Sequence, residues 1–134
     1  MQYKAVLTQN EVCRILAAAR QEAQQQGWIV SIAVVDDGGH PLALERLDGA
    51  TPSSAYIATE KARTAALGRR ESKGFEDMVN GGRTAFLSAP LLTSLEGGVP
   101  VSVEGQVIGA VGVSGVKAEQ DAQIAKVGIA ALQG

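Results

Sequence analysis

The residues with the clearest capacity for chemistry lie at positions 34–50, VVDDGGHPLALERLDGA, which include His40, the only histidine of the chain. His40 follows two glycines and precedes Pro41, and the residue before a proline is biased towards an extended backbone. We therefore expect the ring at the turn of a hairpin and at least partly accessible. A lone histidine of this kind is most often a solvated turn residue; the functional alternative is an axial ligand of haem iron.

A second unusual residue is Lys61, which a helical wheel places between Ala58 and Ala65 on a face of small apolar side chains. Burial of an unpaired ammonium is costly, so this lysine must reach solvent, pair with a carboxylate or meet an anionic ligand. We expect its partner to be Asp36 or Asp48. The same three residues are the candidates for acid and base catalysis if the protein acts on a small carboxylate or hydroxycarbonyl compound.

Five of the twelve cations fall within thirteen residues that begin at this lysine: Lys61, Arg63, Arg69, Arg70 and Lys73. Near the C-terminal end of a helix, cations complement the helix dipole, which gives the cluster a structural interpretation. The alternative interpretation is that the cluster receives the propionates of a haem or another small dianion.

A run of glycines late in the chain, Gly109, Gly112 and Gly115, does not match a nucleotide-binding motif. The dinucleotide fingerprint requires G-x-G-x-x-G, and the phosphate-binding loop requires G-K-[ST]. Ser114 in the same stretch misses the G-x-S-x-G pattern of serine hydrolases at its last residue. We expect no nucleotide cofactor. The glycines indicate a strand against which a helix, a neighbouring subunit or a flat ligand can lie closely.

The composition argues against several classes of partner. Twelve Lys and Arg against fourteen Asp and Glu give a formal net charge of −2, which favours neither nucleic acid nor an anionic membrane. No apolar stretch reaches the roughly 18 residues of a membrane span, and the first residues lack a signal-peptide pattern, so we expect a cytoplasmic protein. A single cysteine, Cys13, and the lack of an HExxH motif predict neither a disulfide nor a zinc site.

Helices and hairpins alternate along the chain. Thr8 and Glu11 form a capping box that begins a helix, and Gly27 ends it. The apolar face of this helix carries Val12, Ile15, Leu16, Ala19 and Ala23, with Cys13 at its edge. The later elements are a hairpin within 28–48, a helix from Thr51 to Leu67 closed by Gly68, two short helices at 75–80 and 83–88, a hairpin within 99–115 that turns at Glu104-Gly105, and a helix from 118 to 132 carrying Ile124, Val127, Ala131 and Leu132.

The order α-β-β-α-(α)-β-β-α predicts an α+β fold in which helices cover a central antiparallel sheet, because the strands of a hairpin pair antiparallel. A length of 134 residues suits one compact domain, residues 1–134. The faces of small residues leave apolar surface that one thin sheet cannot cover, so we also predict a homo-oligomer.

Three stretches together resemble the GlcG/HbpS family, which includes haem-binding and haem-degrading domains and the C-terminal domain of some corrinoid adenosyltransferases. These stretches are VVDDGGHPLALERLDGA, the helix EKARTAAL, and GGVPVSVEGQVIGAVGVSG followed by DAQIAKVGIAAL. The likeness spans nearly the whole chain. It implies a profilin-like fold and assembly into homo-oligomers. Some members bind haem, and many are encoded among genes for small-diol or hydroxy-acid catabolism.

On this basis the candidate ligand-binding residues are His40, Arg46, Lys61, Thr64, Gly112 and Ser114, with His40 as the candidate ligand of the haem iron. The first hypothesis is an oligomeric haem- or tetrapyrrole-binding accessory protein associated with diol or hydroxy-acid catabolism. The alternatives are an enzyme that acts on a small carboxylate or hydroxycarbonyl metabolite, and a non-catalytic oligomeric accessory protein. The expected partners are other copies of the chain and haem or a small anionic ligand.

Overall fold

The computed structural model describes residues 1–133. Its elements are the helices α1 Gln9–Gln26, α2 Pro52–Gly68, α3 Lys73–Asn80 and α4 Ala118–Ala130, the 3-10 helices η1 Thr84–Ser88 and η2 Ala131–Gln133, and the strands β1 Ser31–Asp36, β2 Pro41–Arg46, β3 Gly98–Val103 and β4 Gln106–Ser114. The predicted order of helices and hairpins, and with it the α+β class, is confirmed.

The four strands form one sheet in the order β2-β1-β4-β3, and every neighbouring pair is antiparallel. The two hairpins meet at the centre, where Ser31 of β1 pairs with Ser114 of β4. The second hairpin turns at Glu104 and Gly105, as predicted, and both residues have positive φ, 52° and 78°. Strand β2 is therefore an edge strand whose outer side is unpaired.

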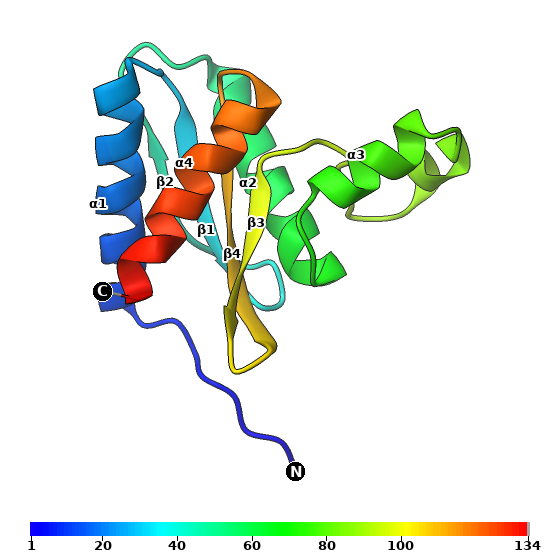
Figure 1. Ribbon diagram of the computed structural model, residues 1–134, viewed down its shortest axis with the longest axis horizontal. Coiled ribbons are helices and arrows are strands. Elements are labelled where there is room, and N and C mark those ends of the chain that lie inside the picture. Colours follow the sequence, from blue (N-terminus) through cyan, green and yellow to red (C-terminus); the bar gives the residue numbers. More distant parts are fainter. Residues whose placement is uncertain (134) are drawn as a thin grey trace.

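Helices cover both faces of this sheet (Figure 1). Alternate side chains of a strand point to opposite faces, so Ile32 and Val34 of β1 pack with α1 and α4, whereas Ala33 and Val35 pack with α2. Helix α1 has the predicted capping box at Thr8, and its buried residues are the five predicted ones. Cys13, which we expected to pack at the edge of that face, is exposed.

Helix α2 lies unusually close to the sheet because both surfaces carry small side chains. A Cβ atom at Gly112 of β4 would clash with the backbone of α2 at Ala58 and Ala62. The predicted end of α2 is wrong by one residue: Gly68 is still helical, and Arg69 takes the left-handed conformation of the cap, with a φ of 57°. Position 68 requires glycine for a different reason, because a Cβ there would lie 2.6 Å from the Phe75 ring.

Helix α3 and η1 form an arm that projects away from the sheet (Figure 1). The two short helices are held together by the rings of Phe75 and Phe86, which stack with centroids 5.2 Å apart. The arm and the loop that follows it expose Leu87, Leu91 and Leu95. Exposed leucines on a projecting segment give the molecule an apolar surface outside its core.

Helix α4 presents a different face to the core from the one we predicted. Its buried residues are Asp121, Ala122, Ile124, Ala125 and Gly128, whereas Val127 is exposed. Ala131 and Leu132 lie in η2 rather than in the α-helix. Of the predicted face, only Ile124 is buried in α4, because α1 and the sheet contact the side of the helix that carries the small residues.

Candidate functional site

His40 lies at the turn between β1 and β2, with 77% of its side chain exposed. The carboxylate of Asp36 accepts hydrogen bonds from the backbone amides of Gly38 and His40, both at 2.9 Å. The same oxygen lies 3.0 Å from His40 Nδ1. An ionised carboxylate only accepts hydrogen bonds, so Nδ1 is the donor in this contact, and in a neutral ring Nε2 then carries the lone pair. The predicted accessibility of the ring is confirmed, and Asp36 orients it.

A groove runs between β2 and α2, with a cavity volume of about 490 Å³. On the β2 side the groove is lined by Leu44, which is 48% exposed, and Leu42, which lies between Leu44 and His40 in the chain, is 42% exposed. On the α2 side, Tyr56 is 78% exposed, and Thr59 and Glu60 line the same groove. The groove thus offers apolar surface along the strand that begins at the histidine.

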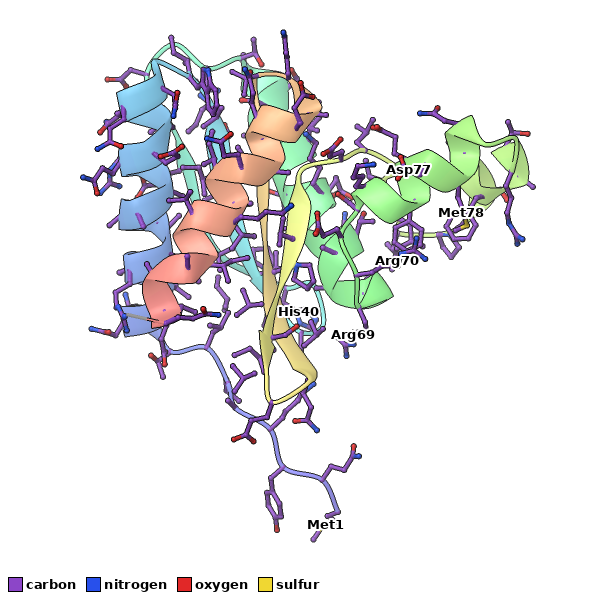
Figure 2. The ribbon with its side chains drawn as sticks, in the orientation of Figure 1. Met1, His40, Arg69, Arg70, Asp77 and Met78 are labelled. Carbon is purple, nitrogen blue, oxygen red and sulfur yellow. The ribbon has the colours of Figure 1, made fainter. Side chains whose placement is uncertain are left out.

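Cations surround the turn that carries His40. Arg69 donates from Nη1 to the backbone carbonyl of Asp37 at 2.6 Å, and Figure 2 shows Arg69 and His40 at the same end of the sheet. Lys4 pairs with the Asp37 carboxylate, and this hydrogen bond holds the pKa of Asp37 below its usual value. The backbone at Gly39 packs against the Arg63 side chain. Each of these cations also has an acidic partner, since Lys4 and Arg69 pair with Asp37 and Arg63 pairs with Glu60.

Lys61 is buried on α2, and its partner differs from the ones we predicted. Its ammonium donates to Asp121 Oδ2 and to the carbonyl of Val113, both at 3.0 Å, and only 5% of its side chain is exposed. The prediction of a carboxylate partner is confirmed, but the prediction that the partner is Asp36 or Asp48 is wrong. The side chain instead extends past the start of β3, where a Cβ at Gly97 would lie 2.8 Å from the ammonium. Lys61 is therefore closed off from any ligand.

Asp121 is the buried partner that the sequence reasoning missed. Burial raises the pKa of its carboxyl, and the nearby Lys61 ammonium opposes that shift. Its Oδ1 accepts from the amide of Val116, which fixes the start of α4. A signal was present in the sequence, because Asp121 lies three and four residues before Ile124 and Ala125 and so shares their buried face. A carboxylate on the buried face of a helix requires a cation nearby to offset the cost of burying its charge.

The three residues proposed for acid and base catalysis do not converge. Asp36 ends β1, and Asp48 follows β2 at the opposite end of the same antiparallel hairpin. Lys61 lies on α2, with its ammonium held by Asp121. The geometry brings no two of them into contact.

The remaining candidate residues divide between packing and surface. Thr64 is buried, donates to the carbonyl of Glu60 and accepts from the amide of Thr93, so it ties a loop to α2. Gly112 lets α2 approach β4, and Ser114 is buried at the end of that strand. Arg46 is exposed and lines the groove. Of the six candidate ligand-binding residues, only His40 and Arg46 have exposed polar side chains.

Residues 1–133 contain no group of three or more His, Cys, Asp or Glu side chains placed to hold a metal ion. Within the same range, each helix is too short or too polar to cross a lipid bilayer. Haem iron can be held by a single histidine and needs no such cluster, so His40 with its partner Asp36 suits this kind of ligand.

The chain is similar to known proteins in both sequence and fold. Residues 7–130 match the family described as "Haem degrading protein HbpS-like". Protein GlcG of Escherichia coli strain K12 is 67% identical over 114 residues, which cover 85% of each chain. The crystal structure of Klebsiella pneumoniae protein ORFY has a TM-score of 0.92 at 30% identity and covers 100% of this chain and 95% of its own. The crystal structure of a PduOC:heme complex has a TM-score of 0.85 at 30% identity, with 95% of each chain covered.

Proposed function

Because this chain belongs to the HbpS-like family of haem degrading proteins, we propose that it binds haem or a related tetrapyrrole as an accessory protein. Nε2 of His40 is the proposed axial ligand of the iron. The observation that carries the proposal is the Asp36 carboxylate on Nδ1, because metal-binding histidines commonly donate their other ring nitrogen to a carboxylate. A similar protein, PduOC, is described in complex with haem, which supports the same proposal.

The surroundings of His40 fit such a ligand. Leu42 and Leu44 expose apolar surface on which a porphyrin can lie. Arg63 and Arg69 stand near the turn, and propionates would meet them in competition with their partners Glu60 and Asp37. These arginines replace Lys61, which we had expected to meet the propionates and which is buried against Asp121. When bound, haem would supply an iron centre for ligand binding or redox chemistry, while His40 would hold the iron and Asp36 would orient the histidine ring.

A titration of the purified protein with hemin tests the proposal. We expect a saturable shift of the Soret band in the native protein and loss of that shift in His40→Ala. Asp36→Asn should bind hemin more weakly, by about 10-fold or more, because the orienting carboxylate is lost. Arg83→Gln, which changes an exposed arginine on the arm, is the matched control and should titrate like the native protein.

Two outcomes would overturn this assignment. If the native protein gives no saturable Soret shift, it does not bind haem. If His40→Ala shows the same Soret band as the native protein, another residue is the ligand, and His40 is a solvated turn residue.

We also propose that the protein is a homo-oligomer. The support is the projecting arm with its exposed Leu87 and Leu91, together with the unpaired edge strand β2 and exposed Tyr56. Light scattering should give a mass that is a multiple of 13.8 kDa at micromolar concentration. A mass near 13.8 kDa throughout that range would reject the oligomer.

The remaining parts of the hypothesis stay predictions: a cytoplasmic location and an association with diol or hydroxy-acid catabolism. The enzyme alternative lacks a specific supporting observation, because Lys61, Asp36 and Asp48 do not share a site. A fractionation experiment with an antibody against the native protein would test the location.

A further inference from the structure

A second pocket lies at the opposite end of the β1–β2 hairpin from His40. It has a cavity volume of about 570 Å³, within the roughly 300–1,000 Å³ of pockets that bind small molecules. Its walls come from the C-terminal end of α1 and from the segments that enter β1 and leave β2. We call it the Trp28 pocket, and its lining includes Arg20, Trp28, Ile29, Arg46, Leu47 and Asp48.

One wall of the Trp28 pocket is apolar. Trp28 is half-buried and packs against the core, as does Leu47, so both side chains are fixed from behind. Ile29 beside them is 51% exposed, although isoleucine is among the residues most often buried. An apolar group of a ligand would remove this surface from water.

The other wall carries one free positive and one free negative charge. Within residues 1–133, the side chains of Arg46 and Asp48 form no ion pair with each other or with a third residue. The nearby Arg20 is different, because its Nη1 donates to both carboxylate oxygens of Glu45, at 2.6 and 2.7 Å. The pocket therefore presents Arg46 and Asp48 as its two unpartnered charges.

We propose that the Trp28 pocket binds a small zwitterionic amino acid with an apolar side chain. Its carboxylate meets the guanidinium of Arg46, a group suited to bidentate carboxylate binding. Its ammonium meets the carboxylate of Asp48, and its side chain packs on Trp28, Ile29 and Leu47. A ligand with no net charge matches a pocket whose unpartnered charges sum to zero.

This site and the haem site lie at opposite ends of β2, although Arg46 lines both the Trp28 pocket and the groove beside α2. Six residues of extended chain separate His40 from Arg46, which corresponds to about 20 Å. An iron ligand at one end of the strand and an amino-acid ligand at the other do not compete for the same atoms. The two proposals can therefore fail separately.

The single tryptophan of the chain gives a local readout, because Trp28 lines the pocket itself. We would titrate the native protein with leucine and with phenylalanine, and follow tryptophan fluorescence and binding heat. A saturable change is expected with both. The analogue without the ammonium, 4-methylpentanoate, and the analogue without the carboxylate, leucinol, should each bind about 10- to 100-fold more weakly.

Variants then assign the effect to the two charges. Arg46→Gln and Asp48→Asn should each weaken leucine binding by about 10-fold or more, while Arg83→Gln should leave it unchanged. Both residues are exposed, so the circular dichroism spectra of the variants should match that of the native protein. Asp48 does not line the groove between β2 and α2, so Asp48→Asn should also titrate with hemin like the native protein. The proposal is overturned if no amino acid gives a saturable change at millimolar concentration, or if both variants bind leucine as the native protein does.

Discussion

The chain contains two pairs of a carboxylate and a basic side chain with the same separation and opposite settings. Asp36 and His40 approach to 3.0 Å, as do Asp121 and Lys61. The side chain of His40 is 77% exposed, whereas that of Lys61 is only 5% exposed. The polar atoms of the buried pair bond within the protein, while the histidine ring of the exposed pair faces solvent. The two pairs have the same separation and differ in their exposure, and it is the exposed pair that we propose as a binding site.

The largest effect should come from breaking the buried pair. Lys61→Ala leaves the Asp121 carboxylate buried without its cation, which should lower the free energy of unfolding by about 3–5 kcal/mol in urea titrations. The double variant Lys61→Met with Asp121→Leu should regain most of this loss, because no charge is then buried. Lys73→Ala breaks the exposed pair with Asp77 and should cost about 0–1 kcal/mol. A cost for Lys61→Ala as small as that for Lys73→Ala would contradict the comparison.

A smaller effect is expected from a change in the close packing of α2 on β4. Gly112→Ala places a methyl group against the α2 backbone at Ala58 and Ala62, so the helix must move away from β4. Such overpacking should lower the free energy of unfolding by about 1–3 kcal/mol. A thermal melt of the variant that matches the native one would show that α2 is not held as closely as we describe. Hemin binding at His40 should be unchanged.

The pH dependence of stability should report on the buried carboxyl of Asp121. The pKa of Asp121 is raised in the folded protein by burial, so the folded state binds more protons than the unfolded state between the usual carboxyl range and the raised pKa. The contribution of Asp121 to stability is therefore greatest at low pH and decreases as pH rises through that window. Relative to Asp121→Asn, the native protein should gain stability in urea titrations when pH falls from neutral to about 4. A constant difference across this range would contradict the assignment.

The smallest effect on stability should come from the exposed pair. His40→Ala removes a side chain that supports no core packing, so the free energy of unfolding should change by no more than about 0.5 kcal/mol. The haem spectrum should nevertheless change strongly. A large loss of stability in this variant, measured by urea titration, would show that the Asp36–His40 contact is structural after all.

The sequence predicted the fold more completely than the site. The capping box at Thr8 and the turn at Glu104 are local signals, and both predicted elements are present. Burial of Lys61 also followed from local spacing. Its partner did not, because Asp121 lies 60 residues away and is brought near only when α4 docks at the end of β4. The Trp28 pocket was missed for the same reason, because its lining combines residues 20–29 with residues 46–48, which only the folded hairpin brings together.

The antiparallel centre of the sheet has a consequence for how the protein is made. Strands β1 and β4 pair with each other, but β4 begins only at Gln106, so a ribosome must synthesise most of the chain before the two can meet. Until then the first hairpin is a two-stranded ribbon, which is marginally stable in water, and its Ile32 and Val34 lack the covering core. The nascent chain therefore exposes an unpaired β1 edge, which is a surface on which incomplete chains can pair with one another. Folding should be completed only late in translation, when the second hairpin closes the sheet.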